Sequence, residues 1–170
     1  MRGYLLVEPD FPTANKSKNH KDFLPIALLK IASYLRGQGH RVGLARGMGT
    51  RLGDLGWPGE LQPDEVWVTS LFTYWAAHVR EAVQYYRSLF PEAVVRVGGI
   101  YASLRPPKEV IGYTGCDAVH QGVLRAVEEH ATSNFPAYDL IEDANPHPVD
   151  YQILHASRGC PRRCPFCGTW

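Results

Sequence analysis

Three short apolar runs constrain the fold of this chain more than any other feature. They are rich in β-branched residues, do not alternate cleanly with polar residues, and comprise Tyr4–Val7, Val66–Leu71 and Val94–Val97. This pattern is typical of strands in a parallel sheet, because helices bury both faces of such a sheet. Weaker strands are predicted at Arg41–Ala45 and Ala118–His120.

Segments with helical periodicity follow several of these runs. Apolar residues at helical spacing predict helices over Ile26–Leu35 and Ala76–Phe90, and a short helix over Leu124–His130. The glycine-rich segment Arg46–Pro63 is interpreted as a loop. This order predicts an α/β fold, a Rossmann-like doubly wound parallel sheet with ligands at the carboxyl ends of its strands.

The length and composition allow one core and a short extension. The chain has 170 residues, 45% of them hydrophobic and 21% charged. Residues 1–130 are assigned to the Rossmann-like domain, and the proline-containing segment 131–150 to a linker. Residues 151–170 begin with an apolar strand, Tyr151–Ala156. A lone strand cannot bury its faces, so these residues are expected to open a second, incomplete domain.

The charge balance bears on the partners and the location of the protein. The 18 basic and 17 acidic residues nearly cancel, so no strong overall field would recruit nucleic acid or a membrane surface. No apolar stretch is long enough to span a bilayer or to serve as a secretion signal. A soluble, cytoplasmic protein is expected.

Three of the four cysteines lie within eight residues, in the CxxxCxxC spacing of Cys160, Cys164 and Cys167. Soft thiolates favour zinc, copper(I) or iron-sulfur clusters. Three thiolates on a cubane cluster leave one iron without a protein ligand, and an open position is typical of catalytic metal sites. The alternative is a structural zinc site with a fourth ligand from Cys116 or His155.

The cysteine loop resembles the signature of radical S-adenosylmethionine (radical SAM) enzymes, which has an aromatic residue, here Phe166, before the last cysteine. The resemblance implies that Cys160, Cys164 and Cys167 ligate a [4Fe-4S] cluster whose fourth iron binds S-adenosylmethionine. It also implies that this compound is cleaved reductively to a 5'-deoxyadenosyl radical, with Phe166 near the adenine. In the family this loop follows the first strand of a partial (β/α) barrel, the place that Tyr151–Ala156 would take.

The N-terminal domain resembles the cobalamin-binding domain of one branch of that family, which carries DxHxxG, SxL and GG segments. This chain has, at similar spacing, Asp22-Phe-Leu24-Pro-Ile-Ala27, then 41 residues, Thr69-Ser-Leu71, then 26 residues, and Gly98-Gly99. The resemblance makes Thr69, Leu71, Gly98 and Gly99 candidate cobalamin contacts. The alternative interpretation of the glycine pair is a turn that needs positive φ.

The chain departs from the cobalamin-binding pattern at two places. Leu24 and Ala27 replace the histidine and the glycine of the first segment, and leucine cannot ligate cobalt. Asp117–Gln121 stands where related domains commonly carry a Gly-Glu-Gly-Glu turn. Cobalamin is therefore one possible cofactor beside the cluster and S-adenosylmethionine.

The resemblance implies an enzyme, either a cobalamin-dependent methyltransferase or another radical catalyst. Its substrate would be a small molecule or a peptide, and a flavodoxin or ferredoxin would donate the electron. The 170-residue chain is expected to be inactive alone, because half a barrel cannot shelter a radical from solvent. Two alternatives remain open: a non-enzymatic Rossmann-like binding module with a zinc-stabilised tail, and a scaffold domain that binds no cofactor.

Overall fold

The structure, a computed structural model, describes residues 1–12, 24–48, 62–130, 135–142, 153 and 162. Its five described strands are all parallel and form one sheet in the order β2-β1-β3-β4-β5. The strands are β1 (Gly3–Glu8), β2 (Arg41–Arg46), β3 (Glu65–Ser70), β4 (Val94–Gly99) and β5 (Ala118–Val119). This is the strand order of flavodoxin-like doubly wound sheets, so the predicted Rossmann-like α/β fold is confirmed.

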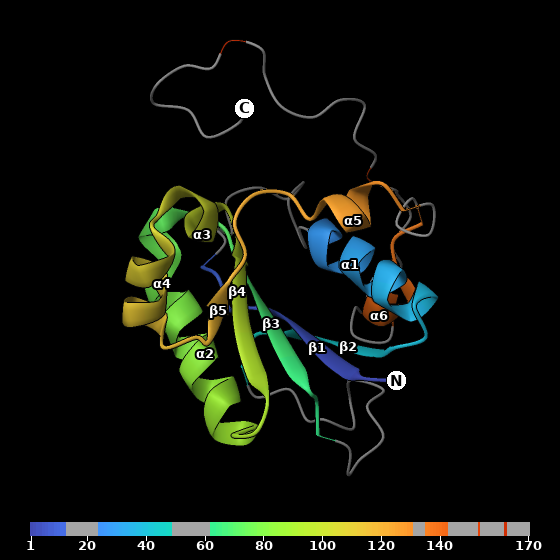
Figure 1. Cartoon of the computed structure of the whole chain (residues 1–170), viewed down its shortest axis with the longest axis horizontal. Helices are drawn as coiled ribbons and strands as arrows, with labels where there is room; N and C mark the ends of the chain where they lie inside the picture. The colour runs from blue at the N-terminus through green and yellow to red at the C-terminus, as the bar shows by residue number, and fades with distance from the viewer. Residues whose placement is uncertain (13–23, 49–61, 131–134, 143–152, 154–161, 163–170) are drawn as a thin grey trace.

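Helices cover both faces of the sheet (Figure 1). One face, here called the α1 face, carries α1 (Ile26–Gly37), α5 (Arg125–Glu128) and α6 (Asp139–Glu142). The opposite face carries η2 (Thr73–Trp75), α2 (Ala76–Leu89), α3 (Ile100–Leu104) and α4 (Pro107–Thr114). The connection through α1 and the connection through α2 therefore lie on opposite sides, as a doubly wound sheet requires.

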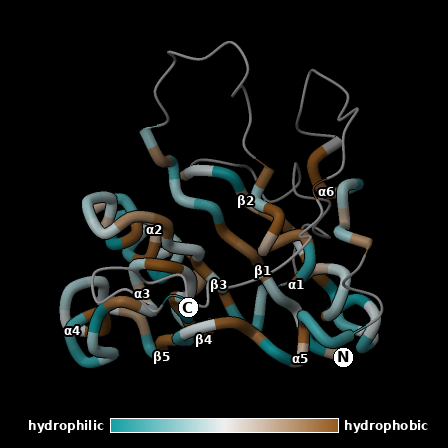
Figure 2. The backbone as a smooth tube through the Cα atoms, turned by 90° about the horizontal axis from the view of Figure 1, so that it is seen from above, coloured by the Kyte–Doolittle hydropathy of each residue, from teal (hydrophilic) through white to brown (hydrophobic). Residues whose placement is uncertain are grey.

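Strand β1 shows why an uninterrupted apolar run predicts this architecture. Leu5 and Val7 point into the core cluster shared with α2, whereas Tyr4 and Leu6 point into the cluster shared with α1. All four side chains are buried, because successive residues of a strand face opposite sides of the sheet. Hydrophobic colouring accordingly runs along β1 in the middle of the molecule (Figure 2).

The predicted elements differ from the observed ones mainly at their ends. The segment between β4 and β5 forms two helices, α3 and α4, over which no helix bounds were predicted. Strand β5 ends at Val119, before the predicted end at His120. Among the described residues, no helix is long and apolar enough to cross a membrane.

Part of the predicted linker 131–150 belongs to the core. Helix α6 lies within it, and Ala137 and Ile141 are buried in the cluster beneath α1. The side chain of Tyr138 also accepts a hydrogen bond from the backbone N–H of Ile153, at 3.1 Å. The predicted second domain otherwise lies outside the described residues, so the division into domains stays a prediction.

A candidate ligand pocket at the carboxyl edge of the sheet

Five residues, each near the end of a strand or directly after it, form a row across the carboxyl edge of the sheet. This carboxyl-edge row consists of Arg46, Glu8, Thr69, Gly98 and His120. Glu8 pairs with Arg46, and Thr69 pairs with Gly98. The pairing of β1 with β3, continued by one residue, places Glu8 beside Thr69. The pairing of β4 with β5, continued in the same way, places Gly98 beside His120. All five positions face α1, because the residues just before them, such as Val7 and Val97, face α2.

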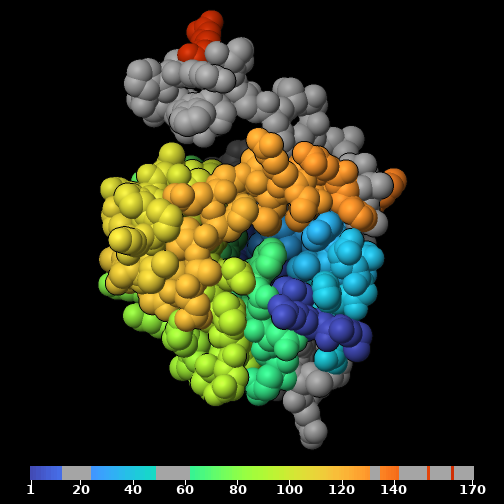
Figure 3. Space-filling view, in the orientation of Figure 1, coloured from blue at the N-terminus to red at the C-terminus, as the bar shows by residue number. Residues whose placement is uncertain are grey.

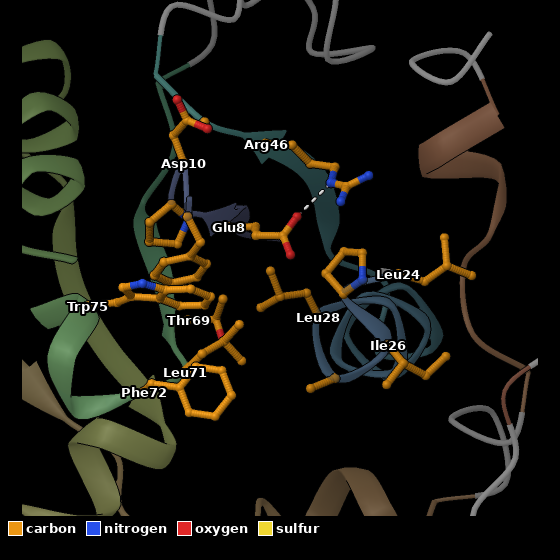
Figure 4. A pocket seen from close by; sticks show the side chains of 15 residues that line it. Glu8, Asp10, Leu24, Ile26, Leu28, Arg46, Thr69, Leu71, Phe72 and Trp75 are labelled. Carbon is orange, nitrogen blue, oxygen red and sulfur yellow. Dashed lines mark hydrogen bonds and ion pairs between the residues drawn. The ribbon is translucent and has the colours of Figure 1, made fainter. Parts of the chain in front are cut away.

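A pocket of about 540 Å³ lies against one half of this row, a volume typical of small-molecule sites. It opens where β1 and β3 end side by side, which is the switch point of a sheet with this strand order. Helix α1 begins on its other side (Figure 4). The lining residues are Glu8, Pro9, Asp10, Phe11, Leu24, Pro25, Ile26, Ala27, Leu28, Arg46, Gly47, Thr69, Leu71, Phe72 and Trp75.

An ion pair supplies the main charged groups of the pocket wall. The Nε of Arg46 donates to Oε2 of Glu8 at 2.5 Å, and both side chains are largely removed from solvent. Burial raises the pKa of Glu8, and the charge and hydrogen bond of Arg46 oppose that effect. A charged pair in an otherwise apolar wall can orient the polar groups of a bound molecule.

Aromatic rings form the wall opposite α1. Phe11 and Trp75 stack with ring centroids 5.1 Å apart and an interplanar angle of 17°, and both line the pocket. Phe72, also in the lining, stacks on Tyr74 with centroids 5.1 Å apart. Phe72 is 44% and Tyr74 71% exposed. These flat surfaces suit a planar or apolar ligand group.

Two of the candidate contacts predicted from sequence, Thr69 and Leu71, line this pocket. The hydroxyl of Thr69 has no hydrogen-bond partner among the described residues and points into the cavity region (Figure 4). Leu24, at the histidine position of the first segment, is 7% exposed and belongs to the apolar wall with Ala27. The first segment thus contributes apolar contact here rather than a metal ligand.

The two candidate glycines have different reasons to be glycine. Gly99 has a φ of 103°, and a Cβ there would lie 2.2 Å from the carbonyl oxygen of Ser70, so the fold itself requires glycine. Gly98 has no such requirement, since the nearest atoms to its Cβ position belong to His120, at 3.8 Å. The turn interpretation therefore accounts for Gly99 and leaves Gly98 for another explanation.

Several residues of this edge were missed by the sequence analysis. Ser70 is 1% exposed, and its hydroxyl donates to the carbonyl oxygen of Gly98 at 2.7 Å and accepts from the N–H of Ala102 at 3.2 Å. Glu8 and Arg46 were missed as well. A charged residue directly after an apolar strand is the signal that could have identified them, because ligands of such sheets bind at that end.

The metal ligands predicted from the sequence are not among the described residues. Cys160, Cys164, Cys167 and Phe166 lie outside the described residues, as does Asp22 of the first segment. Within the described part of the chain, no group of three or more histidine, cysteine, aspartate or glutamate side chains could hold a metal ion.

The fourth cysteine, Cys116, is among the described residues, and its surroundings do not favour a role as a zinc ligand. It is 3% exposed and packs in the core cluster on the α2 face. Burial raises the pKa of its thiol, which disfavours the thiolate that zinc would need. The other candidate for a fourth zinc ligand, His155, is outside the described residues.

Of the known proteins compared with this chain, only solved structures show similarity to it. No family model and no curated protein matches the chain. A novel cobalamin-binding protein from Desulfitobacterium hafniense DCB-2 is similar with a TM-score of 0.45 and 14% sequence identity, over 75% of this chain. The match spans 55% of that protein's length. Similarity at this level assigns no family.

Proposed function

We propose that this chain is part of a radical SAM enzyme whose N-terminal domain binds cobalamin at the carboxyl edge of the sheet. The observation that carries the cobalamin part is the pocket at the end of β1 and β3, which is lined by Thr69 and Leu71 of the predicted binding pattern. The CxxxCxxC spacing of Cys160, Cys164 and Cys167 supports the radical SAM part. The reaction would be a methyl transfer or another radical reaction.

The described residues fit one portion of cobalamin. A cavity of about 540 Å³ between α1 and the aromatic wall suits the flat benzimidazole of its nucleotide tail. Leu28 and Trp75 would pack on that group, and the Thr69 hydroxyl would bond to it. Cobalamin supplies a cobalt centre that carries a methyl group. No described residue of the first segment would ligate it, because Leu24 has no donor atom.

The cobalamin part is tested by titrating the 170-residue chain with hydroxocobalamin and following the visible spectrum. Saturable binding at micromolar concentration is expected. Thr69→Val should weaken it about fivefold, the value of one neutral hydrogen bond of about 1 kcal/mol. Thr73→Val is the matched control, because Thr73 is exposed at the start of η2 and does not line the pocket. Absence of saturable binding by the unaltered chain would refute this part.

The radical SAM part is tested by metal analysis after anaerobic reconstitution. About four irons and four sulfides per chain are expected, as a cubane cluster contains, and a variant with alanine at Cys160, Cys164 and Cys167 should lose both. Cys116→Ala is the control and should retain the cluster. Electron paramagnetic resonance of the reduced cluster should change when S-adenosylmethionine is added. Stoichiometric zinc without iron would favour the zinc-stabilised binding module instead.

A further inference from the structure

The imidazole of His120 presents a buried polar atom without a partner. Its Nε2 is shielded from solvent and has no hydrogen-bond partner among the described residues. The backbone of His120 is held in place, since its N–H donates to the carbonyl oxygen of Val97 at 2.9 Å. Buried polar atoms in proteins are almost always paired, so an unpaired one calls for a partner that binds there.

The neighbour of this imidazole is the glycine that the fold does not require. Gly98 lies between Thr69 and His120 in the carboxyl-edge row, and a side chain at Gly98 would project toward α1 between them. Thr69 and His120 are separated by two strand spacings, about 10 Å. Without a Cβ at Gly98, the floor between the two polar side chains is open.

The surface above this floor is hollowed. In the space-filling view, the hollow lies between α1 and the segment that runs from β5 to α5, over the sheet (Figure 3). Helices α1 and α5 meet above it through the ion pair of Lys30 with Glu128, at 2.8 Å. The hollow therefore has the sheet as its floor and α1 as one wall, and His120 belongs to the segment from β5 to α5 that borders it.

From these observations we infer that the binding site extends from Thr69 across Gly98 to His120, whose Nε2 hydrogen-bonds an acceptor atom on the nucleotide tail of cobalamin. The acceptor is a phosphate oxygen or a nitrogen of the base, and both belong to the tail and not to the corrin. The inference rests on the proposed function, and it gives the tail a second polar contact besides Thr69. His120 stands in the segment where the chain departs from the cobalamin-binding pattern, so this contact would be particular to this chain.

Three variants of the 170-residue chain test the inference. His120→Leu removes the imidazole and keeps an apolar side chain of similar bulk. His120→Gln retains a nitrogen donor at a similar reach and should restore part of the affinity. His78→Ala is the control, because His78 lies on α2, on the opposite face of the sheet, and its Nδ1 pairs with Glu81 at 3.8 Å.

Each variant is titrated with hydroxocobalamin and with cobinamide, which lacks the nucleotide tail. His120→Leu should bind cobalamin about tenfold more weakly and cobinamide as well as the unaltered chain does, since a hydrogen bond to a charged group is worth about 1.5 kcal/mol or more. Its melting temperature should be equal or higher, because it loses an unpaired buried polar atom. A purely structural histidine would instead lower the melting temperature. Cobinamide phosphate in the same titration separates a phosphate acceptor from a base nitrogen.

The outcomes separate failure of this inference from failure of the proposed function. Unchanged cobalamin affinity in His120→Leu, or equal losses for cobalamin and cobinamide, would overturn the role of His120 and leave the cobalamin site standing. Lack of saturable cobalamin binding by the unaltered chain would overturn the cobalamin site itself, and the role of His120 with it.

Discussion

A Cβ atom on Gly99 would lie 2.2 Å from the carbonyl oxygen of Ser70, inside any permissible contact distance. Gly99→Ala should therefore destabilise the protein by about 2 kcal/mol or more, through this clash and the cost of a left-handed conformation. Gly98→Ala should change the free energy of unfolding by less than about 1 kcal/mol, because its Cβ has space. Urea unfolding followed by circular dichroism compares the two.

The same pair of variants separates folding from binding. Gly98→Ala should fold normally and bind cobalamin more weakly, since the new methyl group would stand on the floor between Thr69 and His120. Equal stability losses in both variants would mean that the two glycines together serve the turn.

A second prediction concerns the rim of the pocket. The hydroxyl of Tyr86, on α2, donates a hydrogen bond to the carbonyl oxygen of Gly47 at 2.8 Å, and Tyr86 is 2% exposed. Tyr86→Phe should lower the free energy of unfolding by about 1 kcal/mol, because the bond is lost and the carbonyl of the half-buried Gly47 loses its donor. Tyr85→Phe is the matched control, since the Tyr85 hydroxyl has no partner among the described residues. Thermal unfolding of both variants measures the difference, and equal losses would contradict this role of the Tyr86 hydroxyl.

A third prediction follows from Asp117, which directly precedes β5. Burial alone would raise the pKa of Asp117, but the hydrogen bond from the Val95 backbone and the pairing with Arg87 outweigh burial and lower it below its ordinary value of 3.8. A carboxyl with a lowered folded-state pKa contributes stability that is present above 3.8 and is lost as the pH falls through the folded-state value.

Asp117→Asn should therefore be less stable than the unaltered chain at pH 6, by about 1 kcal/mol because solvent screens the half-exposed pair. The gap should close as the pH falls below 3.8. Urea unfolding at a series of pH values measures it. A gap that stays constant down to the lowest pH would show that the carboxylate charge contributes nothing.

A fourth prediction has the opposite sign and concerns Glu8. Its pKa lies above the ordinary value of 4.5, because burial outweighs the attraction of Arg46. The folded state then binds the proton more tightly than the unfolded state. The stabilisation that comes from this tighter proton binding is fully present below pH 4.5 and is lost as the pH rises through the folded-state pKa.

The unaltered chain should consequently gain stability relative to Glu8→Gln as the pH falls from neutral toward 4.5. The difference in free energy of unfolding between the two proteins, measured by urea titration at each pH, gives the sign directly. A decrease over that interval would mean that Arg46 dominates and that the pKa of Glu8 is lowered.

The fold was accessible from the sequence because its strongest elements are also its most buried. The run Tyr4–Val7 faces core on both sides, and the stripe in Ala76–Phe90 keeps Val79, Val83 and Tyr86 against the sheet. Helix α6 was not anticipated, since four residues are too few for a periodic pattern and their order comes from packing beneath α1.

The candidate site was only partly accessible. Thr69 and Leu71 were identified through spacing, and the structure brings them to one pocket. Glu8, Arg46 and His120 are separated widely in sequence and come to lie in one row only through the parallel register of different strands. No local pattern reports that register. The cysteine loop shows the reverse situation, since its spacing is strong in sequence and its residues lie outside the described structure.

The carboxyl-edge row also bears on how such a protein could evolve. Each of its five positions comes from a different strand, or follows one directly, and none belongs to either core cluster. Substitutions in the row can therefore alter ligand preference while the interior is left intact. Insertions or deletions within a strand are another matter, because a shift of one residue turns the side chain to the opposite face. Lineages of this domain should thus diversify at the row by point substitution and keep their strand lengths fixed.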